Sequence, residues 1–213
     1  MHPSADMGRR GPSPLRPRRI PVRSPERHLA ARDPVIRDVI NSAPERWSAC
    51  PAPFPLWGLT RIVIAQQIST AVATRQAEQV ADRYPPIRRL GTAAIVLDPD
   101  VLRGLGLTTR KARTCEELSR RAPEITARTR AGESWSDVVG PISGIGPWTL
   151  QVFGMLVLKQ QDVLPEGDVG LARAIERKYG PAAALSNLSE AWKPYRTVAC
   201  WYLWRSLGNE PLG

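Results

Sequence analysis

The sequence predicts an all-α fold. Apolar side chains recur at helical spacing along the 213 residues, and no alternating strand pattern of useful length appears. At 42% apolar residues, the chain can form one compact domain or two small lobes that share a cleft. Helical patterns are expected over 34–41, 54–65, 69–83, 100–104, 108–122, 135–139, 148–159, 168–178 and 194–207.

Residues 1–32 differ from the rest in composition. They hold eight arginines, six prolines and only two acids, and so carry +6 of the formal charge of +10. Such a segment cannot bury enough apolar surface to order itself, so we expect a disordered basic arm that raises nonspecific DNA affinity. Its prolines argue against the amphipathic helix of a transit peptide. Residues 33–213 are mildly basic, so DNA affinity there must come from individually placed contacts.

Several classes of protein are excluded by composition. No signal-peptide core and no apolar run near 18 residues occurs, which predicts a soluble, intracellular protein of the cytoplasm or nucleoid that binds no membrane. Cys50, Cys115 and Cys200 show no metal-ligand spacing. His2 and His28 both fall within the arm, which argues against zinc and against histidine catalysis.

Two glutamines join the expected helices 54–65 and 69–83. Ser69 is typical of a helix N-cap. Gln66 and Gln67 can be read as ordinary caps of helix ends, or as part of a surface that contacts a ligand. The local pattern leaves both readings open.

A tight hairpin precedes the expected helix 148–159. Gly144 and Gly146 allow a sharp turn and close approach of a ligand, and Pro147 suits the first turn of a helix. The amides at a helix start bind phosphate well. An ordinary corner between two helices, with no ligand, has the same local features.

A Pro/Gly loop over 163–167 follows this helix and ends at Asp168, the expected N-cap of helix 168–178. Taken alone, this aspartate is most simply a cap. It lies 20 residues past Trp148, one helix and one loop away, so the fold can return it to the hairpin side.

Four segments in this order and spacing resemble the helix–hairpin–helix Gly/Pro–Asp DNA glycosylases, and within them the 3-methyladenine DNA glycosylase II type. The segments are Ile64–Ser69, Ser143–Thr149, Leu164–Asp168, and Trp192–Arg196 with Trp201 and Trp204 behind it. The resemblance covers 33–208. It implies one glycosylase domain over 33–213 with two helical lobes, a hairpin at about 141–149 and an active-site cleft between the lobes.

The resemblance also implies roles for individual residues. Asp168 becomes the catalytic carboxylate, and Trp148 and Trp204 line the base pocket. Val152 belongs to that pocket as well, at a position where the best-known alkylpurine member has an aromatic residue, which implies a wider pocket. Gln67 is the wedge that fills the gap left by an extruded base.

The hairpin is expected to hold the DNA backbone through Gly144, Gly146 and Thr149. By resemblance, the carbonyls of Gly140, Ile142 and Ile145 bind a structural monovalent cation. The cysteine spacing excludes the four-cysteine iron–sulfur cluster of several relatives, and no cofactor is expected for the chemistry. Further candidates for phosphate contact are Arg110, Lys111 and Arg113.

Trp148 stands where bifunctional members carry their nucleophilic lysine, which predicts a monofunctional enzyme. Neither Lys111 nor Lys159 matches that position, and both are expected on the solvated surface. The expected function is excision of alkylated purines by a monomer that acts from the minor-groove side of damaged duplex DNA. Alternatives are a glycosylase for uracil, a mismatched or an oxidised base, and a noncatalytic DNA-damage-binding protein.

Overall fold

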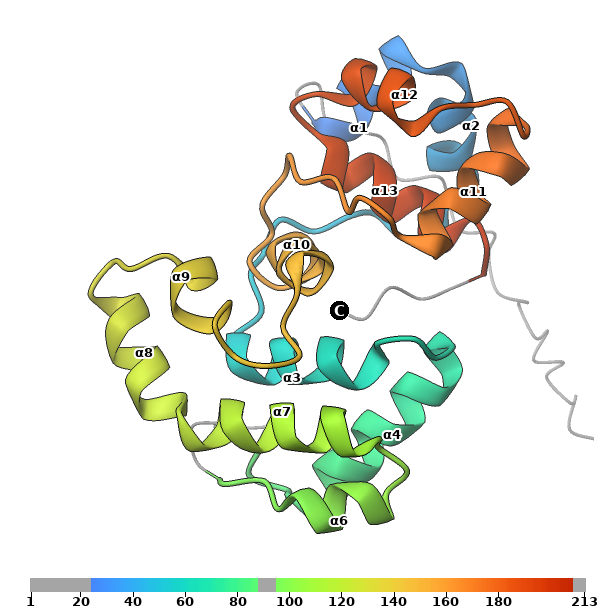
Figure 1. Cartoon of the computed structure of the whole chain (residues 1–213). Coiled ribbons are helices and arrows are strands. Elements are labelled where there is room, and N and C mark those ends of the chain that lie inside the picture. Colours follow the sequence, from blue (N-terminus) through green and yellow to red (C-terminus); the bar gives the residue numbers. More distant parts are fainter. Residues whose placement is uncertain (1–23, 88–94, 209–213) are drawn as a thin grey trace, which may run out of the picture.

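The computed structural model describes residues 24–87 and 95–208, which form twelve helices and no strand. The predicted all-α class is therefore confirmed. The helices fall into two groups with α10 between them (Figure 1). No helix of these described residues is long and apolar enough to cross a bilayer.

One group, the first lobe, joins the start of the described chain to its end. α13 packs against α2 and α11, and α1 packs against α2 and α12 (Figure 1). Its members are α1 (Pro25–Arg32), α2 (Pro34–Ser42), α11 (Val169–Tyr179), α12 (Leu185–Trp192) and α13 (Arg196–Arg205). The centre of this lobe is α13, in which every residue from Thr197 to Trp204 is buried. This burial on all sides explains why α13 lacks the one-sided apolar stripe of a surface helix.

The second lobe comprises the helices in the middle of the chain. α3 packs against α4, α7 and α10, and the chain then continues through α8 into α9. Its members are α3 (Pro55–Ala65), α4 (Thr70–Arg83), α6 (Pro99–Gly104), α7 (Thr109–Arg120), α8 (Ala122–Arg130) and α9 (Trp135–Val139). α10 (Pro147–Leu156) lies on α3, and its residues 152–156 are buried.

The expected boundary of the basic arm at residue 32 is wrong. Residues 25–32 form α1, which begins at the Ser24 cap and Pro25. Leu29 is fully buried, and the buried carboxylate of Glu26 accepts a hydrogen bond from the Tyr202 hydroxyl. The composition wrongly predicted that residues 25–32 are disordered. A few apolar and acidic side chains suffice to fold this helix, because the rest of the lobe supplies the partners that bury them. The expected disorder of 1–23 falls outside the described residues.

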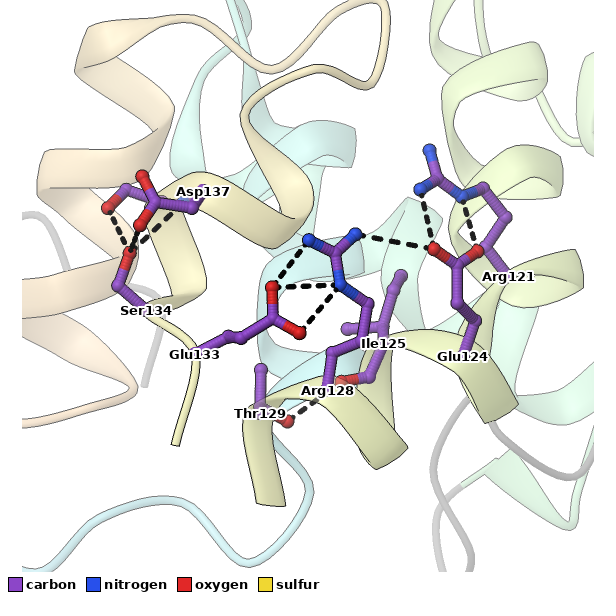
Figure 2. A network of polar contacts seen from close by, with 9 residues as sticks. Arg121, Glu124, Ile125, Arg128, Thr129, Glu133, Ser134 and Asp137 are labelled. Atoms are coloured by element: carbon purple, nitrogen blue, oxygen red, sulfur yellow. Dashed lines mark hydrogen bonds and ion pairs between the residues drawn. The ribbon is translucent and has the colours of Figure 1, made fainter. Parts of the chain in front are cut away.

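Two further helices, α8 and α12, were not predicted. The pattern over 108–122 spans α7 and the start of α8, and Pro123 in the first turn of α8 marks the break between them. Surface ion pairs hold this region together (Figure 2). Arg128 pairs with Glu133 at 2.6 Å and with Glu124 at 3.4 Å, and Arg121 pairs with Glu124 at 3.1 Å.

Candidate active site

The side chain of Asp168 is held by three hydrogen-bond donors. Oδ1 accepts from the Leu171 amide at 2.5 Å and from the Trp204 indole N–H at 2.9 Å. Oδ2 accepts from the Trp148 indole N–H at 2.8 Å. The bond from Leu171 makes Asp168 the N-cap of α11, so the predicted cap is confirmed.

These bonds bring three distant parts of the chain together. Trp148 belongs to α10, Asp168 begins α11, and Trp204 lies near the end of α13. Since α10 packs on α3 of the second lobe, the carboxylate lies where the two groups of helices meet. Asp168 thus returns to the hairpin side, beside the second residue after Gly146. A cleft between the lobes stays a prediction.

A groove of about 410 Å³ is lined by Asp168 and by residues of α11, among them Val169 and Arg173. Val169 is 63% exposed, which is unusual for a valine in this chain. Val152, by contrast, is buried in the core one turn beyond Trp148, so it lines no open surface, and its expected contact with a base stays a prediction.

The hairpin before α10 is anchored by its apolar residues. Ile142 and Ile145 are buried, and the Ile145 amide donates to the Ile142 carbonyl at 3.0 Å. Gly146 is the N-cap residue of α10 and Pro147 opens the helix, as predicted. The first amides of α10 have no carbonyl of their own helix to bind, because a helix start lacks the preceding turn.

The two hairpin glycines are required for different reasons. Gly144 has φ +94°, and a Cβ there would lie 2.2 Å from the Thr114 hydroxyl oxygen. Its face is therefore filled by protein, not left open for a phosphate as expected. A Cβ on Gly146 would meet nothing within 4 Å, so the expected open approach is retained at that position only.

The turn between α3 and α4 lies against this hairpin. Gln67 is exposed and has φ +57°, a conformation that residues other than glycine rarely adopt. Gln66 points inward, and its Nε2 donates to the Gly144 carbonyl and to Thr149 Oγ1, both at 2.9 Å. Thr149 is itself buried and its hydroxyl accepts from Gln66, while its expected contact with the DNA backbone stays a prediction.

The loop that ends at Asp168 is fixed at its start, an arrangement that the sequence did not indicate. The Arg196 guanidinium binds the Asp162 carboxylate at 2.7 and 3.0 Å and the Asp162 carbonyl at 3.1 Å. The Arg196 side chain holds the pKa of Asp162 below its ordinary value. Thr197 adds a hydroxyl bond to the Val163 amide at 3.0 Å.

Of the basic residues at the start of α7, only two remain candidates for phosphate contact. Arg110 and Arg113 are exposed. Lys111 is buried, against the expectation of a solvated surface, and its Nζ donates to the Ile64 carbonyl at 2.8 Å. Burial lowers its pKa. Lys111 therefore stabilises the last turn of α3 rather than binding DNA.

No family model matches the sequence. The chain is 29% identical over 198 residues to the "Probable bifunctional transcriptional activator/DNA repair enzyme AlkA" of Mycobacterium tuberculosis. The alignment covers 82% of this chain and 38% of that protein, so the chain spans well under half of the relative's length.

Two solved structures share the fold. The DNA-3-methyladenine glycosidase of Bacillus halodurans superposes with a TM-score of 0.59 at 28% identity, over 87% of this chain and 90% of that one. The Schizosaccharomyces pombe 3-methyladenine DNA glycosylase Mag1, solved in complex with abasic DNA, gives a TM-score of 0.68 at 21% identity. That match covers 86% of this chain and 96% of that one.

Proposed function

Because the chain belongs to the helix–hairpin–helix Gly/Pro–Asp superfamily of DNA glycosylases, and its relatives include DNA-3-methyladenine glycosylases, we propose that it excises alkylated purines from duplex DNA. The reaction is hydrolysis of the N-glycosidic bond, the first step of base excision repair. The observation that carries the proposal is the carboxylate of Asp168, held by two indole N–H groups and a helix-start amide, in a residue that also lines a groove.

The chemistry follows from charge. A purine alkylated at N3 or N7 is already cationic, so it leaves without much help from a general acid. Positive charge then develops on the sugar, as in glycoside hydrolysis. A carboxylate fixed before the reaction stabilises this oxocarbenium-like state better than water, because its donors need no reorganisation.

The hydrogen bonds at Asp168 favour this electrostatic role over that of a general base. A carboxylate has about four acceptor positions, and Leu171, Trp204 and Trp148 occupy three of them. One position on Oδ2 remains for the sugar or a water molecule.

The base itself would be held by aromatic faces. Trp148 and Trp204 both present their N–H edges to Asp168. Trp148 is partly exposed and would offer its ring face to the extruded purine, whereas Trp204 is buried, so its expected contact with the base would be limited to the edge of the pocket. An aromatic face attracts a cationic ring by roughly 0.5–2 kcal/mol, which favours alkylated bases without strict specificity. Gln67, exposed at the tip of its turn, would fill the gap in the duplex from the minor-groove side.

The hairpin would hold the DNA backbone at Gly146 and the first amides of α10. The carbonyls of Gly140, Ile142 and Ile145 would bind a monovalent cation that bridges to a phosphate. The Ile142 carbonyl already accepts from the Ile145 amide, and the second lone pair of a carbonyl oxygen suffices for a cation. The protein would act as a monomer.

The enzyme would be monofunctional, because Trp148 offers no amine for a Schiff base. We expect no covalent adduct when the protein acts on lesion-containing DNA in the presence of borohydride. A trapped adduct would contradict this part of the proposal and would direct attention to Lys111 or Lys159.

The proposal is tested by the products released from DNA. Methylated duplex DNA should yield free methylpurines, whereas duplexes with uracil, a mismatch or an oxidised guanine should yield little. Excision of one of these other bases without methylpurine release would assign the chain to another lesion. Binding without release of any base would favour the noncatalytic damage-binding alternative.

Asp168→Asn tests the proposed catalytic role of the Asp168 carboxylate. Asparagine caps a helix as well as aspartate does, so α11 should remain folded. We expect DNA binding to persist while single-turnover excision falls by about 10²–10³-fold or more, since the negative charge at the sugar is lost. Excision at nearly the unaltered rate would show the mechanism to be wrong.

A further inference from the structure

Gln66 directs its amide into the protein, although its neighbour Gln67 is exposed. Both protons of its Nε2 are engaged, one by the Gly144 carbonyl and one by Thr149 Oγ1, each at 2.9 Å. Gly144 belongs to the hairpin and Thr149 to the first turn of α10. One side chain therefore connects the turn between α3 and α4 to the segment that is the candidate phosphate site.

α7 supports the same two segments from behind. Lys111 Nζ binds the Ile64 carbonyl at the end of α3, and Thr114 Oγ1 binds the Ser143 carbonyl of the hairpin, both at 2.8 Å. Residues three apart lie on the same face of a helix, so a single face of α7 holds both segments. Lys111, Thr114 and Thr149 are all buried, so three of the side chains that make these bonds belong to the interior.

Gln67 takes no part in these hydrogen bonds, and its side chain is exposed to solvent. Its φ of +57° is costly for a side chain other than glycine and persists only where the surroundings enforce it. The enforcing contacts are those of Gln66, its immediate neighbour, and of Lys111 at Ile64.

We propose that Gln66 is a positioning residue that makes the Gln67 turn and the hairpin a single rigid unit, so that base extrusion depends on Gln66 although it faces away from DNA. This inference rests on the proposed function. A wedge that enters the stack is pushed back by the bases it separates. The turn resists this push only if it is fixed to a segment that is itself held on the DNA backbone.

The test is Gln66→Met, which keeps the length of the side chain and removes both donors. Single-turnover excision is measured on 7-methylguanine paired in a duplex and on the same base in a single-nucleotide bulge, where extrusion costs least. We expect excision from the paired site to slow about tenfold, in keeping with the loss of two hydrogen bonds, and excision from the bulge to change little. Equal slowing on both substrates would overturn the proposal.

Gln76→Met is the matched control. Gln76 makes the same kind of bridge, from α4 to the Gly106 carbonyl at 2.8 Å, but contacts neither the Gln67 turn nor the hairpin. It should leave the ratio of the two excision rates unchanged. If Gln66→Met does not fold, Thr149→Val removes one acceptor from the opposite end of the bridge at nearly constant volume and is expected to change that ratio in the same direction.

A double-mutant cycle tests the route of the effect. If Gln66 acts through Gln67, then Gln66→Met should add little in a Gln67→Ala background. Effects that simply multiply would contradict this route.

Fluorescence of 2-aminopurine beside the lesion reports extrusion without requiring excision. Should the unaltered chain release no methylpurine, the proposed function fails. The fluorescence of Gln66→Met, compared with that of Gln76→Met, would still decide whether Gln66 governs extrusion.

Discussion

Asp168 combines two roles that the sequence could only present as alternatives. Its Oδ1 caps α11 through the Leu171 amide, and the same carboxylate receives the Trp148 and Trp204 indoles. The two tryptophans were expected to offer ring faces to a base. The structure shows that their N–H edges are occupied by Asp168, so they fix the carboxylate whatever their faces bind.

At this scale we predict the effect of removing one indole N–H. Trp204→Phe keeps an aromatic face but deprives Asp168 Oδ1 of a donor. Loss of a hydrogen bond to a charged group is worth about 1.5–3 kcal/mol, so the excision rate should fall by roughly 10–100-fold. DNA affinity, measured by fluorescence anisotropy, should stay within about twofold.

The matched control is Trp192→Phe. The Trp192 indole also donates to a carboxylate, that of Asp33 at 2.8 Å, which lies apart from Asp168 in the first lobe. This change should lower the free energy of unfolding without slowing excision by the folded protein. Equal losses of activity in both variants would mean that the Trp204 effect reflects stability alone.

Among the elements, the connection from α7 to α9 is held by charge. Side-chain hydrogen bonds from Arg128 and Arg121 hold the pKa values of Glu133 and Glu124, respectively, below the ordinary value of 4.5. The two glutamates are exposed and the two arginines partly exposed, and isolated pairs of this kind contribute little. Here several pairs form one network, which runs from Arg121 along α8 to Glu133 in the loop before α9 (Figure 2).

This network predicts a pH dependence of stability. A carboxylate whose pKa is lowered on folding stabilises the fold above its unfolded pKa, and that contribution is lost as pH falls through the folded value. Glu133→Gln should therefore lower Tm more at pH 7 than near pH 3. The measurement is thermal unfolding of both proteins at the two pH values. A Tm difference of the same size at both pH values would show that Glu133 acts through packing.

At the scale of the whole molecule, hydrogen bonds join the start of the described chain to helices near its end. Asp33 caps α2 through the Val35 and Ile36 amides, and its Oδ2 accepts from the Tyr179 hydroxyl at 2.7 Å and from Trp192. Burial raises the pKa of Tyr179, which keeps the hydroxyl a donor. One buried carboxylate thus joins α2, α11 and α12. Of these, α11 is the helix whose N-cap is Asp168.

Asp33→Ala should destabilise the first lobe strongly. It removes a cap and leaves the buried Trp192 indole and the partly buried Tyr179 hydroxyl without their acceptor, which costs about 3 kcal/mol or more. Urea unfolding measures the loss. Asp38→Ala, on the exposed surface of α2, should change the free energy of unfolding by no more than about 0.5 kcal/mol. A similar loss in both variants would contradict the role given to Asp33.

Local patterns determined much of this protein. Apolar spacing marked most of the helices, and their polar ends marked the caps at Ser69 and Asp168, because both features depend on neighbours within one or two turns. What a polar side chain binds at long range was decided by the tertiary structure alone. Gln66 finds its partners 78 and 83 residues away, and Asp162 finds Arg196 at a separation of 34. Helical periodicity shows which face of a segment is buried, but a hydrogen bond also needs a partner that only packing brings within about 3 Å.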